Sequence, residues 1–327
     1  MMLAFSCFCD AHFHLCDVKS VKINDYSLEN DFNSFSLYMG CSSATCEEEF
    51  VNQEKFIDAY KNQNVTIVSS FGIHPQNPSV ECLEYEEFLL QNNKISAIGE
   101  IGIDLFSEEF KKNKEQQEFI WNCQLDLALK YNKPIVIHCR KGMEFIFKYC
   151  DKLKKLPSVV FHSFSGSVVE AKSLLNKGIN AFFSFGKAIL NNNKNAINCV
   201  KFLPLNVILF ETDAPYQTLK NEEFTSVRDI CRIYEQCYLL REYSKDDIQK
   251  QFEFSEIIKN NLSLPEYGKF GSKIEWSSSD ESIISPDGTV TRPESSELNQ
   301  NPDVVLTATI TNGGTVRQKN FVFMVVR

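Results

Sequence analysis

The chain has 327 residues and a formal net charge of −9, from 34 basic and 43 acidic side chains. Its 43% hydrophobic and 24% charged residues are typical of globular proteins, which excludes a largely disordered chain. The acidic balance also excludes broad coating of nucleic acid through a basic surface, but not an enzyme that holds a few phosphates through bound cations. A chain of this length accommodates an α/β barrel of about 250 residues together with an appendage.

The sequence carries no signal for a membrane or for secretion. No run approaches the roughly 20 apolar residues of a membrane helix. The segment 1–10 lacks the basic region and the cleavage site of a signal peptide, so we expect a cytoplasmic protein without a membrane partner. All twelve cysteines precede Tyr238 without a repeated Cys-x-x-Cys pair, which predicts free thiols rather than a disulfide framework.

Short runs of β-branched and aromatic residues alternate with helix-like stretches along the first 260 residues. The predicted strands are 5–14, 36–41, 65–73, 95–101, 135–138, 159–164, 181–185 and 207–211. The clearest amphipathic helix is 114–131, and Ser167 with Glu170 forms a capping box that predicts a helix start. The first connection, 17–35, is weakly patterned, and we expect it to be mostly loop. This alternation predicts a parallel (β/α)₈ barrel, with an open doubly wound sheet as the alternative.

The composition of the sequence changes after about Asn261. Cysteine is absent from this part, and turn-forming residues separate short strand-like runs. These runs are 273–276, 289–291, 304–311 and 320–326. The turn signals Pro286-Asp287-Gly288 and Asn312-Gly313-Gly314 lie between them. We therefore expect a small all-β sandwich, and divide the chain into a barrel domain, 1–261, and a β domain, 262–327.

Every histidine falls at the carboxyl end of a predicted strand. The five are His12, His14, His74, His138 and His162. In a parallel barrel these ends converge on one face, which is where such folds carry their chemistry. Residues two apart on a strand point to the same side, so the first two imidazoles can reach one ion.

Two acidic residues occupy equivalent positions. Glu100 closes the fourth predicted strand and Asp213 follows the eighth. A carboxylate facing a barrel mouth is costly unless cations or hydrogen bonds compensate it, and each of its oxygens can bind a different cation. Histidines and carboxylates together therefore favour a two-metal hydrolytic site.

Six motifs occur in a fixed order along residues 1–260. They are Asp10-Ala11-His12-Phe13-His14-Leu15, Gly72-Ile73-His74-Pro75, Gly99-Glu100-Ile101-Gly102-Ile103-Asp104, Ile137-His138-Cys139-Arg140, Phe161-His162-Ser163-Phe164-Ser165-Gly166 and Glu211-Thr212-Asp213-Ala214-Pro215-Tyr216. In this order they resemble the TatD-family deoxyribonucleases. The resemblance implies a metal-dependent barrel of the amidohydrolase type that removes nucleotides from DNA 3′ ends, single-stranded or frayed.

The resemblance also implies roles for individual residues. One metal would be held by His12, His14, Glu100 and Asp213, and the second by His138 and His162, with Glu100 bridging. The two divalent ions are Mg²⁺ by resemblance, and Zn²⁺ and Mn²⁺ also suit these ligands. Asp213 is the candidate proton acceptor and counts with Glu100 as catalytic.

The resemblance implies two residues that contact the substrate and two that orient the metal ligands. His74 and Arg140 are candidate substrate contacts. The resemblance equally allows His74 to lie behind the metal ligands instead of touching a substrate phosphate, and an ion pair of Arg140 with a nearby acid is equally compatible with the sequence. We expect Asp104 and Glu211 to orient the ligands.

Three positions depart from the family pattern. Gln76 replaces a second histidine, Lys141-Gly142 replaces an acidic residue, and the segment 217–224 is short and lacks the usual proline. These changes affect substrate contacts rather than the metal ligands.

The tail resembles a degenerate bacterial immunoglobulin-like domain, in which Trp276 would pack between two sheets.

Two alternatives to the nuclease stay open. One is another amidohydrolase-type enzyme acting on a small phosphoester, ester or amide. The other is a degenerate barrel whose tail serves binding or adhesion to a partner that the sequence does not identify.

Overall fold

The computed structural model describes residues 7–23, 26–60, 64–241, 261–262, 264–268, 272–291, 303–312 and 315–324. They belong to two compact units, Met1–Glu242 and Tyr243–Arg327, which are considered separately. The predicted division at 261/262 stays a prediction.

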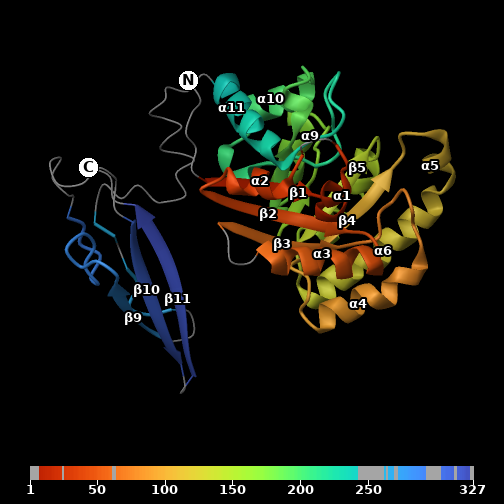
Figure 1. Cartoon of the computed structure of the whole chain (residues 1–327). Coiled ribbons are helices and arrows are strands. Elements are labelled where there is room, and N and C mark those ends of the chain that lie inside the picture. Colours follow the sequence, from red (N-terminus) through yellow and green to blue (C-terminus); the bar gives the residue numbers. More distant parts are fainter. Residues whose placement is uncertain are drawn as a thin grey trace. The chain divides into compact units, whose positions relative to one another are not determined.

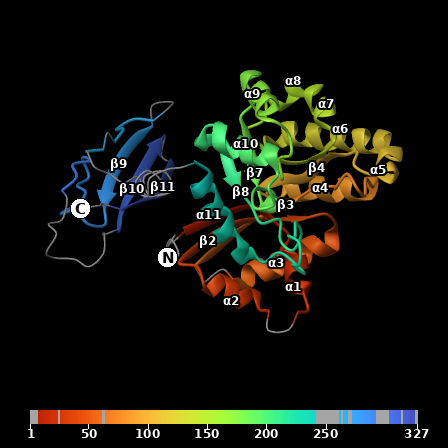
Figure 2. The same cartoon turned by 90° about the horizontal axis from the view of Figure 1, so that it is seen from above.

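The first unit is an eight-stranded parallel sheet with the strands in sequence order, from β1 to β8 (Figures 1 and 2). The strands are β1 (Cys7–Phe13), β2 (Leu37–Ala44), β3 (Val65–Phe71), β4 (Ala97–Asp104), β5 (Ile135–Arg140), β6 (Val159–Phe161), β7 (Ala181–Phe185) and β8 (Ile208–Phe210). All eight predicted strands are present, and the predicted barrel is confirmed.

Hydrogen bonds just beyond the last strand bring the two ends of the sheet together. The Asp213 N–H donates to the carbonyl of His12 at 2.9 Å, and the His14 N–H donates to that of Ala214 at 2.8 Å. Beside them, the buried Asp10 carboxylate accepts hydrogen bonds from the Thr212 backbone and hydroxyl. The carboxyl ends of β1 and β8 are therefore neighbours, so the strands close into a nearly complete ring.

Helices lie outside the strands (Figure 2). They are α1 (Leu15–Ser20), α2 (Leu28–Asn33), α3 (Glu47–Tyr60), α4 (Leu83–Gln91), α5 (Glu108–Lys112), α6 (Lys114–Tyr131), α7 (Met143–Phe147), α8 (Cys150–Leu153), α9 (Val168–Asn176), α10 (Lys194–Phe202) and α11 (Ile230–Arg241). The predicted helix 114–131 coincides with α6, and the Ser167–Glu170 capping box starts α9. The buried indole of Trp121 packs from α6 against Phe145 and Tyr149.

The expectation that 17–35 is mostly loop is wrong. This connection contains part of α1 and all of α2, each six residues long. Each helix buries only two apolar side chains, so neither shows a periodic pattern over more than one turn or so. Ser27 nevertheless caps α2 by accepting from the Asn30 N–H.

The described part of the second unit contains one antiparallel sheet in the order β11–β10–β9. Its strands are β9 (Lys273–Ser278), β10 (Asp303–Asn312) and β11 (Thr315–Met324). One face buries Ile283, Ile284, Val304 and Leu306. This agrees with the predicted small all-β domain, although the run 289–291 forms only an isolated bridge.

Trp276 does not lie between two sheets in the described residues. Its half-buried ring packs at the edge of that apolar cluster, 5.5 Å from the Phe321 ring centroid, and its indole N–H donates to the Pro265 carbonyl. Residues 313–314 of the predicted turn lie outside the described residues.

Eleven of the twelve cysteines have described side chains, and all eleven are free thiols, as predicted. None of the described helices is both long enough and apolar enough to cross a membrane.

The buried carboxyl group of Glu86 should make the stability of the protein depend on pH. Its side chain is fully buried in α4, neither carboxylate oxygen has a hydrogen-bond partner among the described residues, and burial raises its pKa well above the usual range. The folded state therefore favours the protonated acid, and this group costs stability as pH rises above its unfolded pKa. We expect Glu86→Gln to stabilise the protein at pH 8 by roughly 1.4 kcal/mol or more, the equivalent of one pKa unit.

Urea unfolding of the wild type and Glu86→Gln at pH 4.5 and pH 8 measures this effect. The gain should shrink toward zero at the lower pH, where both side chains are neutral. An equal difference at both pH values would show that Glu86 does not titrate in this way.

Candidate metal centre and active-site cavity

Four side chains from three segments of the barrel, at β1, in β4 and after β8, point their ligand atoms at a common position. The Nε2 atoms of His12 and His14 lie 3.2 Å apart. Each is 3.4 Å from Oε2 of Glu100 and 3.5 Å from Oδ1 of Asp213. All four residues are less than one-tenth exposed.

A second group gathers around the other carboxylate oxygen of Glu100. Its Oε1 lies 2.8 Å from Nε2 of His162 and 3.1 Å from Nδ1 of His138. The Nε2 atom of His74 is 3.3 Å from His138 and 3.8 Å from Glu100. The two oxygens of one carboxylate thus face two separate sets of histidines.

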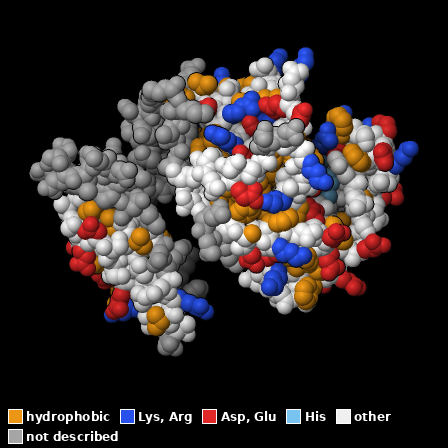
Figure 3. All heavy atoms as spheres, viewed as in Figure 1, with side chains coloured by type: hydrophobic (Ala, Val, Ile, Leu, Met, Phe, Trp, Pro, Cys, Tyr) orange, Lys and Arg blue, Asp and Glu red, His pale blue; other side chains and the backbone are white. Residues whose placement is uncertain are grey.

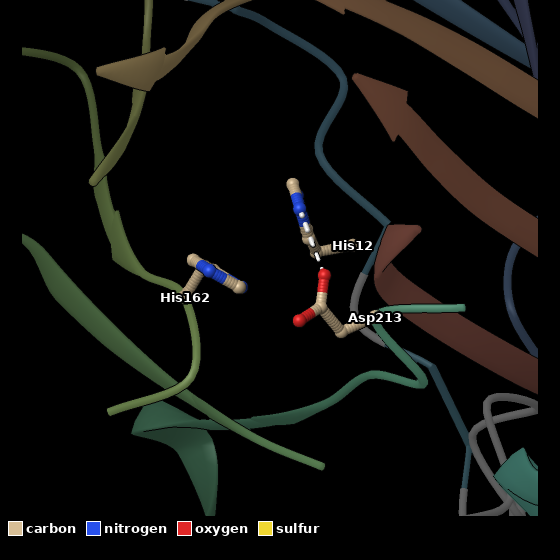
Figure 4. Close-up of side chains that lie close together, drawn as sticks. All are labelled: His12, His162 and Asp213. Carbon is tan, nitrogen blue, oxygen red and sulfur yellow. Dashed lines mark ion pairs between the residues drawn. The ribbon is translucent and has the colours of Figure 1, made fainter. Parts of the chain in front are cut away.

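Figure 4 shows His12, His162 and Asp213, with the two imidazole rings facing the carboxylate. Their ligand atoms all lie within 4.8 Å of one another, as do those of His12, His14 and Glu100, and those of His74, Glu100 and His138. The structure therefore brings together all six residues predicted as ligands. The assignment of ligands to particular ions stays a prediction.

Two more carboxylates hold the outer edges of the histidine rings. Asp104 Oδ2 is 3.1 Å from Nε2 of His138, and Glu211 Oε1 is 3.2 Å from Nδ1 of His162. Glu211 also accepts from the Ser163 backbone N–H at 2.7 Å. A carboxylate behind an imidazole fixes the ring orientation and raises its basicity as a ligand.

The electrostatics of the cluster are those of a cation site. Burial alone would raise the pKa of Glu100, but the surrounding histidines, foremost His162 and His12, hold it well below its usual range. Burial likewise would lower the pKa of His14, whereas Asp213 and Glu100 raise it to about 10. Ionised carboxylates in a water-poor site need compensating positive charge.

The donor set fits divalent metal ions on geometry as well as on charge. Four ligands at 2.0–2.2 Å around a tetrahedral ion are separated by about 3.3–3.6 Å. The separations among the His12, His14, Glu100 and Asp213 ligand atoms, 3.2–3.5 Å where measured, agree with this value. A bridging role suits Glu100 because its oxygens face different histidine sets.

The backbone around the site adopts uncommon conformations. Asp213, Ser163 and Gln217 have φ values of 53°, 46° and 53°, in the left-handed region that non-glycine residues seldom enter. Gly102 has φ 147°, and a Cβ there would lie 2.0 Å from the His138 carbonyl, so only glycine permits this approach of β4 to β5. Such conformations cluster at functional sites.

Gln217 belongs to this site, although no role for it was predicted. Its amide Nε2 donates to Oδ2 of Asp213 at 3.0 Å and to the Ser163 hydroxyl at 2.9 Å. One Asp213 oxygen therefore faces the histidines while the other is held by an amide. The only available signal was that Gln217 begins the segment that departs from the family pattern.

The histidines line a cavity of about 1070 Å³ at the barrel mouth. Arg140 lines the cavity, and its guanidinium lies 3.7 Å from Asp104. Its side chain is 43% exposed, so it makes the predicted ion pair and is also accessible for the predicted substrate contact. Gln76 donates to the same carboxylate at 2.8 Å. His74, predicted as a substrate contact, lines the cavity within the second ligand group.

The lining of the cavity also includes residues that the sequence did not single out. Asp17 and Glu49 place oxygens within 4.8 Å of a His14 nitrogen and of one another. Phe106 and Tyr216 also line the cavity, each 50% exposed.

Comparison with known proteins identifies the family. Residues 9–257 match the family model described as TatD related DNase, well over half of the chain. The chain therefore belongs to the TatD-related DNase family. Residues 245–327 match the atrophied bacterial Ig domain, which confirms the predicted character of the tail.

Two curated relatives carry related names. A protein of Buchnera aphidicola subsp. Baizongia pistaciae, named an uncharacterized metal-dependent hydrolase, is 31% identical over 178 residues, covering 53% of this chain and 64% of the relative. The 3′-5′ ssDNA/RNA exonuclease TatD of Erwinia amylovora is 32% identical over 152 residues, covering 45% and 58%. The match spans about three-fifths of each relative. Family and names support the prediction of a metal-dependent hydrolase.

Solved structures agree with the fold. The crystal structure of YJJV, a TatD homologue from Escherichia coli K12, superposes with a TM-score of 0.60 at 25% identity and covers 74% of this chain and 93% of its own. A hydrolase TatD family protein from Entamoeba histolytica gives 0.59 at 22% identity, covering 72% and 92%. The latter bears on the fold alone.

The contact between Glu211 and His162 predicts a loss of metal affinity on substitution. Glu211→Gln removes the negative charge that lies 3.2 Å from Nδ1 of His162, and we expect affinity for Zn²⁺ or Mn²⁺ to fall about 10- to 100-fold. The stabilisation by saturating metal should fall by about 1.4–2.7 kcal/mol. Chelator competition and thermal unfolding with and without metal measure both. Glu118→Gln is the control, because it makes the same change in α6 at a side chain that accepts from the Tyr149 hydroxyl at 3.0 Å, and equal losses in the two variants would contradict the prediction.

Proposed function

We propose that this chain is a divalent-metal-dependent nuclease that hydrolyses phosphodiester bonds, acting as a 3′-5′ exonuclease on DNA. The observation that carries the proposal is the position of Glu100, whose two oxygens each face a separate set of buried histidines. The family to which the chain belongs and the printed name of the Erwinia relative support the nuclease activity.

Two groups of residues would hold the metal ions. His12, His14, Glu100 and Asp213 would hold one, and Glu100, His138 and His162 the other. When bound, divalent cations neutralise the anionic oxygens of a phosphodiester and make a bound water more acidic. Mg²⁺ is our first choice from the family resemblance, and this histidine-rich set also suits Zn²⁺ and Mn²⁺.

Asp213 would take up a proton from the attacking water. Burial would raise its pKa, but His162, His14 and His12 lower it, so the carboxylate is ionised at neutral pH and can accept a proton. Gln217 and the left-handed backbone hold the carboxylate in one orientation. Orientation of the base contributes directly to rate because a proton is transferred only at hydrogen-bond distance.

The depth of the site favours an end of a single strand as substrate. The ligand side chains are less than one-tenth exposed, so a scissile phosphate has to enter the cavity. A single-stranded or frayed end does so without the unpairing that enzymes acting within a duplex have to perform. In the described part of the chain, acidic and basic side chains intermingle on the face in Figure 3, as expected for a protein that does not coat DNA.

One specific observation keeps a second enzyme class in view. Gln76 and Gln217 both place amides near the site, bonded to Asp104 and Asp213. Neutral amides near the centre would also suit a small phosphoester, ester or amide substrate, as in other amidohydrolase-type enzymes. Among the described residues of the tail, no group of histidine, cysteine or acidic side chains gathers as metal ligands would, and the partner of the tail stays unassigned.

The central test is cleavage of single-stranded DNA labelled at its 5′ end, in the presence of Mg²⁺, Mn²⁺, Zn²⁺ or EDTA. We expect stepwise 3′ shortening that EDTA abolishes. Glu100→Gln should reduce the rate at least 100-fold because it removes one negative charge shared by both metal positions.

Glu86→Gln provides the matched control. This side chain is also buried, lies in α4 and does not line the cavity, so its activity should equal that of the wild type. Hydrolysis of a small chromogenic phosphodiester or amide, with no DNA shortening under any metal, would replace the proposal by the second class.

Gln217 gives a separate kinetic prediction. Gln217→Leu preserves the approximate side-chain size but removes both hydrogen bonds, including the one to ionised Asp213. We expect kcat to fall about 10- to 100-fold, with KM changing less than threefold, because the base rather than the substrate is released. Steady-state kinetics with the melting temperature recorded alongside measure this, and a rise in KM at unchanged kcat would assign Gln217 to substrate binding instead.

A further inference from the structure

Phe106 forms an exposed aromatic surface at the rim of the cavity, two residues after the end of β4. Its ring is 50% exposed, and the guanidinium carbon of Arg140 lies 4.0 Å from the ring centroid. The ammonium of Lys141 is 4.7 Å from the same centroid. These three residues, from neighbouring strand ends, are called the Phe106 platform.

The platform also provides the available positive charge of the cavity. Apart from the histidines, the basic side chains that line it among the described residues are Arg140, Lys141 and Lys187. Lys187 is fully buried and paired with Glu222 at 2.6 Å and Asp229 at 2.7 Å. Lys141 has no ion pair within 4.0 Å in the described parts of the chain. The pKa of nearby Glu108 is lowered chiefly by its hydrogen-bonded pair with Lys111, and Lys141 adds to this.

The opposite wall has the reverse charge. Tyr216 follows β8, four strands from β4 in either direction around the barrel, and is also 50% exposed. Its hydroxyl donates to Asp17 at 2.7 Å, and Glu49 lies on the same wall. A phosphate would meet carboxylates on this side and cations on the other, so electrostatics decides between the two aromatic walls.

We propose that the Phe106 platform is a nucleotide subsite of the nuclease, which binds the nucleotide on the 5′ side of the scissile phosphate. Its base stacks on the Phe106–Arg140 pair, and its phosphate pairs with Arg140 and Lys141. The inference rests on the proposed function and adds the route by which the strand reaches the centre. The 3′-terminal nucleotide carries no phosphate other than the scissile one. Arg140 and Lys141 would therefore bind a phosphate of the strand on the 5′ side of the cleavage point.

Direct contacts connect the platform to the centre. His138 is 3.1 Å from Asp104, Asp104 is 3.7 Å from the Arg140 guanidinium, and that guanidinium is 4.0 Å from the Phe106 ring. The backbone N–H of Phe106 also donates to Asp104 at 2.8 Å. This short path makes the subsite adjacent to the reacting phosphate rather than distant along the strand.

A binding experiment in EDTA tests the subsite without catalysis. The probe is a single-stranded oligonucleotide with 2-aminopurine as the penultimate base at the 3′ end, whose fluorescence is quenched on stacking. We expect quenching by wild type and by Phe106→Tyr, and at least fivefold weaker affinity with recovered fluorescence for Phe106→Ala. Phe119→Ala is the matched control because Phe119 is equally exposed, at 53%, on the outer helix α6.

The kinetic counterpart removes the base instead of the ring. An abasic site at the penultimate position should lower kcat/KM of the wild type about tenfold, mainly through KM. The same abasic site should change kcat/KM of Phe106→Ala less than twofold, because its stacking partner is already gone. Lys141→Gln should reduce the dependence of log affinity on log salt by about 0.7, whereas the exposed Lys155→Gln should not.

The outcomes separate this inference from the proposed function. If DNA is shortened with metal but Phe106→Ala and Phe119→Ala behave alike on both probes, the subsite is wrong and the nuclease stands. If no DNA is shortened but the fluorescence change depends on Phe106, the subsite stands and the nuclease is wrong. Neither cleavage nor quenching would overturn both.

Discussion

The buried Glu100 carboxylate is the interaction on which the site depends. Its charge lies inside a barrel mouth where water is scarce, and histidines from β1, β5 and β6 surround it because those strand ends converge. The barrel closure is part of the same arrangement, since the Asp213 N–H bonds to the His12 backbone while the Asp213 side chain joins the ligands. Fold and chemistry therefore share the same residues at the junction of β1 and β8.

Most of the barrel was predictable from sequence because parallel strands are short, apolar and separated by helices. The eight strand positions and the helix 114–131 follow from this pattern, and strand-end histidines predict convergence without any knowledge of distances. The helices of the first connection were missed because a six-residue helix with two buried side chains is too short to show a helical hydrophobic period. The placement of Trp276 between two sheets stays a prediction, since the described residues of the tail form one sheet and Trp276 packs against its apolar cluster.

Within the site, the residues found by sequence differ physically from those that were missed. Histidines and acids at strand ends are conspicuous because few other roles explain them. Gln217 and Phe106 are ordinary residues in loops, and their roles come from backbone conformation and from neighbours distant in sequence. Only coordinates show that the amide of Gln217 faces Asp213, or that Arg140 stacks on Phe106 as well as approaching Asp104.

The charge distribution resolves the conflict between an acidic protein and the anionic substrate that we propose for it. A net charge of −9 opposes association with DNA over a wide surface, but the field at a rim depends on the nearest groups because more distant charges are screened within about 10 Å. With Arg140 and Lys141 on one wall and Asp17 and Glu49 on the other, the cavity would attract the proposed strand locally and give it a direction. An enzyme that acts at ends needs direction more than affinity, since tight binding along the strand would hold the protein away from the terminus.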